Sequence, residues 1–137
     1  FRRVLFRSGI GAGEGERFQG PTSLGFPQWP ASDEAGVVEE RLELKTPGGA
    51  GLLVTTCAAS DNPDRAASLR ERYTDAVAED MEGYGVALAC HHARPPCWIV
   101  RGISNEVGDR DPTHWRIPSA LSAARRLSLE LLGAEGA

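Results

Sequence analysis

Two short groups of residues carry side chains that could bind a small polar ligand. Met81 and Glu82 precede a run of small and apolar residues that starts at Gly83, and Ser104 and Asn105 follow another apolar stretch. A glutamate at the start of a helix can accept helix N–H groups while its second oxygen binds ligand hydroxyls. An asparagine offers both an amide donor and a carbonyl acceptor. The structural alternatives are a first-turn acid that complements the helix dipole, and a turn residue that bonds its own backbone.

The surrounding elements should bring these two groups together. The residue pattern predicts a half-exposed strand at 37–44, a central strand at 52–56, a short strand at 76–78 and a buried strand at 98–103. It also predicts three helices. The first spans residues 64–73 and is capped by Asp61 or Asn62. The second runs from Gly83 to about residue 92 and is expected to be buried on most of its surface, and the third follows Pro118. This alternation is typical of an α/β fold with a mostly parallel or mixed sheet flanked by helices. Such sheets bind ligands at the carboxyl ends of their strands.

The composition narrows the class of protein. With 137 residues, 41% hydrophobic and 25% charged, the chain is the size of one soluble domain. A net charge of −4 and a single lysine argue against a nucleic-acid partner. No apolar run is long enough to cross a bilayer and no secretory leader is visible, so we expect a cytoplasmic protein without a membrane partner. Three cysteines cannot all pair within one chain, and we expect reduced thiols.

Three other patterns resemble functional motifs only superficially. Cys90, His91, His92 and Cys97 are zinc-binding residue types, but their spacing matches no standard finger and adjacent histidines on a helix point apart. The alternating glycines of residues 11–15 lack the strand and helix of a dinucleotide-binding motif. Ser60, Asp61 and His114 form no recognisable triad. The sequence therefore predicts no metal and no cofactor.

Two of these segments also resemble a known family. Met81-Glu82-Gly83 followed by Arg101-x-Ile103-Ser104-Asn105 is similar to the motif pair of the purine nucleoside phosphorylase and methylthioadenosine nucleosidase superfamily. The continuation Ser-Asn-x-Val-Gly-x-Arg-Asp, with Trp-x-Ile-Pro after it, resembles the futalosine hydrolase branch. The resemblance covers residues 11–132 and corresponds to the C-terminal half of that family's chain. It implies part of a nucleoside-phosphorylase-like three-layer sandwich.

The resemblance also implies roles for the substrate-binding residues. Glu82 corresponds to the carboxylate that binds the ribose hydroxyls, and Met81 to the residue packed beneath the sugar. Cys57, Ala58 and Ser60 fall in the loop that edges the base pocket.

Asn105 is the residue that the resemblance marks as catalytic. It stands where adenine-specific relatives carry an aspartate, Ser104 is expected to hold its side chain, and Arg101 to support the ligand loops. A 6-oxopurine presents O6 and N7 as acceptors, which an asparagine amide can serve. Donors at these atoms would stabilise the negative charge that builds on a departing purine.

The function implied is hydrolysis of the N-glycosidic bond of futalosine, releasing hypoxanthine in menaquinone biosynthesis. The implied partner is a small-molecule nucleoside, and the full-length protein is expected to be a homo-oligomer. The acid that activates water in relatives has no counterpart here, so we assign no general base and expect the chain to be inactive alone. Another purine nucleosidase or nucleoside phosphorylase, and a non-catalytic ligand-binding or oligomerising remnant of the fold, remain as alternatives.

The chain divides into three parts on composition. Residues 1–8 are basic and apolar, and Leu5-Phe6-Arg7-Ser8 is encoded by the adapter-like DNA string CTC TTC CGA TCT. We therefore predict that residues 1–8 are a translated sequencing adapter. Residues 9–132 are expected to form the nucleosidase domain, and residues 133–137 a disordered tail.

Overall fold

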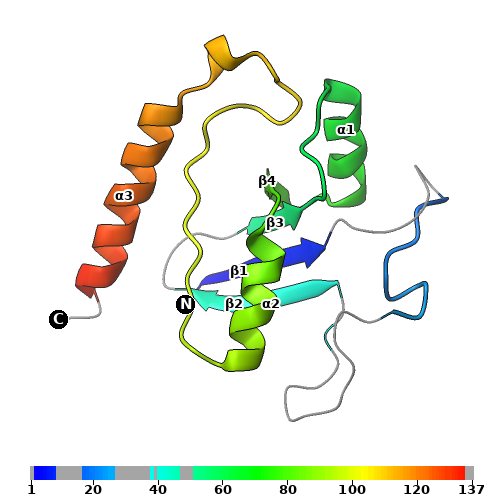
Figure 1. Cartoon of the computed structure of the whole chain (residues 1–137), viewed down its shortest axis with the longest axis horizontal. Coiled ribbons are helices and arrows are strands. Elements are labelled where there is room, and N and C mark those ends of the chain that lie inside the picture. Colours follow the sequence, from blue (N-terminus) through cyan, green and yellow to red (C-terminus); the bar gives the residue numbers. More distant parts are fainter. Residues whose placement is uncertain (1, 9–16, 27–37, 39, 47–50, 135–137) are drawn as a thin grey trace.

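The computed structural model describes residues 2–8, 17–26, 38, 40–46 and 51–134 (Figure 1). In chain order the elements are β1 (Arg2–Ser8), β2 (Arg41–Thr46), β3 (Gly51–Thr55), α1 (Pro63–Arg72), β4 (Ala76–Asp80), α2 (Gly83–Ala93), the 3-10 helix η2 (Pro112–His114) and α3 (Ile117–Ala134). Of the predicted tail, residues 135–137 lie outside the described residues, whereas residues 133 and 134 belong to the end of α3.

The strands form one mixed sheet in the order β2-β1-β3-β4. Strands β1, β3 and β4 run parallel, and β2 pairs antiparallel with β1. This confirms the α/β class that the alternating pattern predicts. Residues 2–8 occupy the sheet between β2 and β3. The adapter prediction concerns the origin of this segment, which strand pairing does not test.

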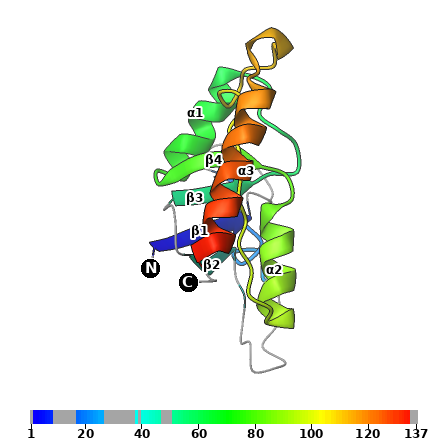
Figure 2. The ribbon, with the colours of Figure 1, turned by 90° about the vertical axis from the view of Figure 1, so that its left-hand side faces the viewer.

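Helices cover both faces of the sheet, because alternate residues of β3 point to opposite sides (Figure 2). Leu53 packs with Tyr84 and Ala87 of α2 on one face. Leu52 and Val54 pack with Tyr73, just after α1, on the other. A strand buried on both faces is central, as its unbroken apolar run predicts.

Helix α1 begins where the sequence predicts. Asn62 is the N-cap, and its side-chain Oδ1 accepts the N–H of Arg65 at 2.9 Å. Asn62 is therefore the cap rather than Asp61. Helix α2 ends at Arg94, whose φ of 60° reverses the chain before two prolines. Only Gly83, Tyr84 and Ala87 of α2 are buried, so the expectation that most of its surface is buried is wrong. The helix covers one face of a small sheet and leaves its other side exposed.

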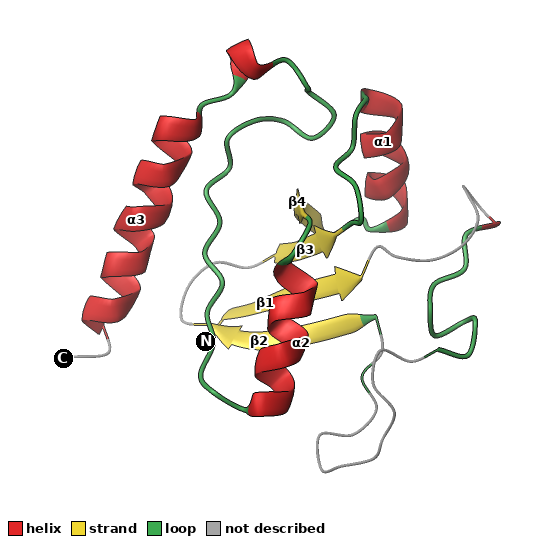
Figure 3. Ribbon diagram, viewed as in Figure 1, coloured by secondary structure: helices red, strands yellow, loops and turns green. Residues whose placement is uncertain are grey.

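The predicted buried strand at residues 98–103 is wrong. The segment is an irregular loop in Figure 3, and Ile103 is 63% exposed. Apolar and β-branched composition produces a strand only where a partner strand supplies hydrogen bonds, and no described strand pairs with this segment. The predicted first strand also begins later, at Arg41.

Helix α3 has the predicted apolar spacing but little covering. Among its described side chains only Ala120 is buried, while Leu121 and Leu132 are each 65% exposed. None of the described helices combines the length and apolar character needed to cross a membrane.

Candidate functional site

The carboxyl ends of β3 and β4 lie side by side and hold the start of α2. Thr55 pairs with Asp80 in the parallel register, and its hydroxyl donates to Asp80 Oδ1 at 2.7 Å. The same hydroxyl accepts the N–H of Tyr84 at 2.8 Å, and Asp80 Oδ1 accepts the N–H of Gly83 at 3.1 Å. The first N–H groups of α2 are therefore satisfied by the two strands.

Glu82 does not serve the helix amides, contrary to the sequence-based expectation. It occupies the N-cap position of α2 without a side-chain capping bond, because Asp80 already accepts the nearby N–H group. Glu82 and Met81 are both exposed at this edge of the sheet. A side chain at position 83 would collide with the Asp80 carboxylate, which explains the glycine after Glu82.

Arg101 ties the irregular segment to the end of β4. Its Nε and a second guanidinium nitrogen lie 3.1 Å and 3.0 Å from Asp80 Oδ2. The Asp80 side chain is only 9% exposed. Its buried charge is therefore compensated by a cation, a hydroxyl and a main-chain N–H group. Arg101 supports the turn before α2, which carries Met81 and Glu82.

The loop after β3 is fastened by Ser60. This residue is 2% exposed, and its N–H and hydroxyl donate to the two oxygens of the Glu79 carboxylate at 2.6 Å and 2.7 Å. Cys57 and Ala58 are exposed, and the Ala58 carbonyl accepts from Arg65 at 3.2 Å. The Ser60 hydroxyl thus has a structural partner in β4.

Asn105 is held by its own loop. Its Oδ1 accepts the Ser104 hydroxyl at 2.6 Å, and its Nδ2 donates to the carbonyls of Glu106 at 2.9 Å and Asp109 at 3.2 Å. Both amide hydrogens therefore have partners. Among the described residues, one lone pair of Oδ1 remains without a contact. The structural alternative, a turn residue that bonds its own backbone, is realised here.

Two hollows adjoin Asn105. A groove of about 1140 Å³ runs between α1 and β4 on one side and residues 102–108 on the other, and its lining includes Ser60, Ser104 and Asn105. A smaller hollow of about 460 Å³ is lined by Asn105 together with His114 and Arg116. Neither hollow is lined by Cys57, Ala58, Met81 or Glu82. Met81, Glu82 and the loop at residues 57–60 follow the neighbouring strands β4 and β3 at one edge of the sheet, but the described residues do not enclose a single pocket around them and Asn105.

Several residues that organise this site were not predicted from the sequence. Thr55, Glu79 and Asp80 hold the loop and the turn, and Asp109 holds Asn105. The position of Asp80 and Glu79 at the end of a strand, directly before Met81, is the sequence signal that could have identified them.

The cysteine and histidine cluster does not form a metal site within the described part of the chain, where no group of three or more ligand side chains converges. All three cysteines are free thiols. Burial, and then the contact with the Cys90 thiol, raises the pKa of Cys97 to about 11.

Comparison with known proteins places this arrangement in context. Residues 28–134 match the family model described as the phosphorylase superfamily. The chain is 39% identical over 114 residues to the futalosine hydrolase of Streptomyces coelicolor, covering 83% of this chain and 48% of the relative. It is 34% identical over 126 residues to the futalosine hydrolase of Thermus thermophilus, covering 86% and 56%.

A more distant relative is the 5'-methylthioadenosine/S-adenosylhomocysteine nucleosidase of Hydrogenovibrio crunogenus, 31% identical over 84 residues, or 60% of this chain and 36% of the relative. The chain spans about half the length of the futalosine hydrolases of Streptomyces coelicolor and Thermus thermophilus. No solved structure gave a significant match.

Proposed function

The chain belongs to the phosphorylase superfamily, and from this premise we propose that it is part of a nucleosidase that hydrolyses the N-glycosidic bond of futalosine and releases hypoxanthine in menaquinone biosynthesis. The observation that carries the proposal is similarity, over more than four fifths of the chain, to two proteins named futalosine hydrolase. The exposed Glu82 and the loop-held Asn105 support it chemically. The activity is that of the whole protein, which we propose is a cytoplasmic homo-oligomer.

The proposed sugar-binding residues are Met81 and Glu82. The Glu82 carboxylate is exposed and makes no capping bond, so both oxygens can accept from the two ribose hydroxyls. Asp80 and Arg101 hold the turn from beneath, so the carboxylate can be oriented without its own contact to the protein. Met81 supplies an apolar surface for the sugar ring.

The proposed base-binding residue is Asn105, and its contacts constrain how it acts. To donate to O6 or N7 of a 6-oxopurine it must exchange one amide contact, and the 3.2 Å contact with Asp109 is the longer of the two. A neutral hydrogen bond contributes about 1 kcal/mol net. A bond to a purine that is gaining negative charge is roughly twice as strong. The exchange is therefore favourable as the base departs, and Asn105 stabilises the leaving group.

The loop after β3 completes the proposed base side. Ser60 lines the groove beside Asn105, while Cys57 and Ala58 precede it at the exposed edge. Because Glu79 holds the Ser60 hydroxyl, Ser60 contributes mainly by fixing the path of this loop.

A second candidate is a nucleosidase acting on a methylthioadenosine-type substrate, favoured by the similarity to the protein of that name. The decisive assay follows hypoxanthine release from futalosine by the protein encoded by the complete gene, with and without inorganic phosphate. Phosphate-independent release, lost in Asn105→Ala and Glu82→Ala, is the expected result. Adenine release from methylthioadenosine would favour the second candidate, and release from neither would leave the non-catalytic remnant.

A further inference from the structure

Residues 104–116 form a loop that is closed at its neck and fixed at its tip. At the neck, Arg116 N–H donates to the Ser104 carbonyl at 2.8 Å. At the tip, Gly108 has φ 91° and lies against α1, so that a side chain there would come within 2.7 Å of the Asn62 carbonyl. We call residues 104–116 the Asn105 loop. Its closed neck and docked tip give it a defined shape.

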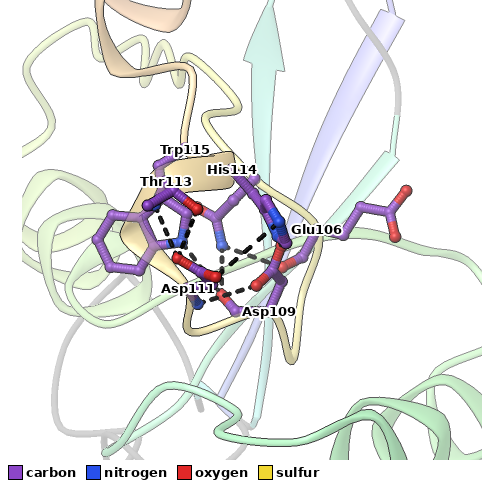
Figure 4. Close-up of polar contacts among 7 residues, drawn as sticks. Glu106, Asp109, Asp111, Thr113, His114 and Trp115 are labelled. Carbon is purple, nitrogen blue, oxygen red and sulfur yellow. Dashed lines mark hydrogen bonds and ion pairs between the residues drawn. The ribbon is translucent and has the colours of Figure 1, made fainter.

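Asp109 is the centre of this loop (Figure 4). Its carbonyl accepts the Asn105 amide and the Trp115 indole N–H, each at 3.2 Å. Its carboxylate accepts the N–H of Asp111 at 2.9 Å and contacts Nδ1 of His114 at 2.9 Å. One residue thus connects the beginning of the loop with its end.

These contacts select one orientation of the Asn105 carboxamide. Rotating the amide by half a turn would place Oδ1 against the carbonyls of Glu106 and Asp109, where two acceptors face each other. It would also remove the acceptor that the Ser104 hydroxyl now uses. Asn105 therefore keeps its nitrogen toward the loop as long as the Asp109 carbonyl stays in place.

The Asp109 side chain is suited to holding that carbonyl. The Asp111 N–H, and then His114, lower the pKa of the Asp109 carboxyl, so it is ionised at neutral pH. His114 can donate from Nδ1 as the neutral tautomer or as the cation, so its contact with Asp109 does not require a charged ring. Asp111, whose carboxylate lies 3.9 Å from Nε2 of His114, faces the other side of the ring.

We propose that Asp109 is a positioning residue that presets the Asn105 carboxamide through the closed Asn105 loop. This rests on the proposed function only in assigning Asn105 to the purine. The carboxylate of Asp109 fixes its own main chain by binding Asp111 and His114, and the fixed carbonyl then holds the amide. Trp115 supports the same carbonyl from the far end of the loop.

The test observes the Asn105 side-chain amide directly by NMR, in the ligand-free chain as given. The amide pair is assigned by its loss in Asn105→Ala. In Asp109→Ala we expect the two amide protons to converge in chemical shift and to exchange with solvent about fivefold faster, since a lost hydrogen bond changes such a population by that order. Asp109→Asn keeps one acceptor oxygen for the Asp111 N–H, and its amide nitrogen can donate to Nδ1 of the other neutral tautomer of His114, so it should restore most of the wild-type spectrum.

The matched control is Glu106→Gln, because Glu106 holds Asn105 through its main chain and its side chain makes no contact that the structure records with the loop. It should leave the amide unchanged. If Asp109→Ala unfolds the chain, Trp115→Phe removes the indole donor, keeps an aromatic ring beside Arg110 and should still shift the amide. An unchanged Asn105 amide in a folded Asp109→Ala or Trp115→Phe variant overturns the proposal. The readout uses no substrate, so its failure is distinct from failure of the futalosine assay.

Discussion

Thr55 and Asp80 face each other across the parallel pair of β3 and β4, and the Thr55 hydroxyl bonds both the Asp80 carboxylate and the N–H of Tyr84. Thr55→Val keeps the shape of the side chain but leaves the buried Tyr84 N–H without its acceptor. We expect a loss of about 1–3 kcal/mol in the free energy of unfolding, measured in urea. Thr74→Val, at an exposed turn position, should change it by less than about 0.5 kcal/mol. Equal effects of the two changes would contradict the assigned role.

Substitutions of the neighbouring acids Asp80 and Glu82 should affect different properties, the first lowering stability and the second lowering activity toward the ligand. Asp80→Asn weakens the contact with Arg101 and disturbs the acceptor at Gly83, so we expect a loss of about 1–3 kcal/mol in unfolding free energy. Glu82→Gln, at an exposed side chain without a capping bond, should change stability by less than about 0.5 kcal/mol. In the protein encoded by the complete gene, Glu82→Gln should instead lower kcat/KM for futalosine. Strong destabilisation by Glu82→Gln would show that its carboxylate has a structural contact.

A glycine-to-alanine substitution should change stability in opposite directions at Gly108 and at Gly85. Gly108→Ala introduces a side chain at φ 91° and within 2.7 Å of the Asn62 carbonyl, and should destabilise by about 1–3 kcal/mol. Gly85 lies inside α2, and a Cβ added there would meet no other atom within 4 Å, so Gly85→Ala should stabilise by about 0.5–1 kcal/mol. Thermal unfolding of the two variants measures both signs. Stabilisation by Gly108→Ala would mean that the loop tip does not dock on α1.

The phenol of Tyr84 gives a pH-dependent prediction. Burial, and then the charge of Glu40, raise its pKa from 10.0 to about 12. The neutral phenol is favoured in the folded state, so this contribution to stability is complete below about pH 10 and is lost as the pH rises through about 12. The phenolate absorbance of Tyr84 is obtained by subtracting the ultraviolet pH titration of Tyr84→Phe from that of the wild type. This difference should show ionisation of Tyr84 near pH 12. A midpoint near pH 10 in the folded protein would contradict the burial.

The contribution of the Asp109 carboxyl to stability depends on pH in the opposite direction. Its pKa is lowered by the Asp111 N–H and by His114, so its contribution is present above the ordinary aspartate value of about 4 and is lost as the pH falls through the lower folded-state value. We expect the Asn105 amide signals to converge only in that acidic range. Convergence already at neutral pH would contradict control of the loop by the Asp109 carboxylate.

Local patterns predicted most elements of the fold, because they depend on nearby residues. The cap at Asn62, the central strand β3 and the apolar spacing of α3 all follow from local composition. The strand predicted at residues 98–103 is wrong because a strand depends on a partner strand, which a local sequence pattern cannot supply. The prediction that most of the surface of α2 is buried is wrong for a related reason, since burial depends on which other elements cover a helix.

The site was predicted in position more than in contacts. Placing Met81, Glu82 and the loop at residues 57–60 at the carboxyl edge requires only the strand order, and the structure has them there. Which carboxylate accepts the helix N–H groups depends on side-chain geometry, and there Asp80 takes the part expected of Glu82. The contacts of Asn105 depend on a loop whose closure joins residues 104 and 116, which composition does not reveal.

The bond from Thr55 to the Tyr84 N–H also has a consequence for hydrogen exchange. A buried hydrogen bond joins the Thr55 hydroxyl of β3 to the first turn of α2, so we expect the amides of both elements to open together, with the slowest exchange among the described elements. Helix α3, with only Ala120 buried among its described side chains, should fray far more often. The Asn105 loop leads directly into α3. The proposed sugar-binding residues Met81 and Glu82 therefore adjoin the strongly protected start of α2, whereas the proposed base-binding residue Asn105 lies in a loop that adjoins the weakly protected helix α3.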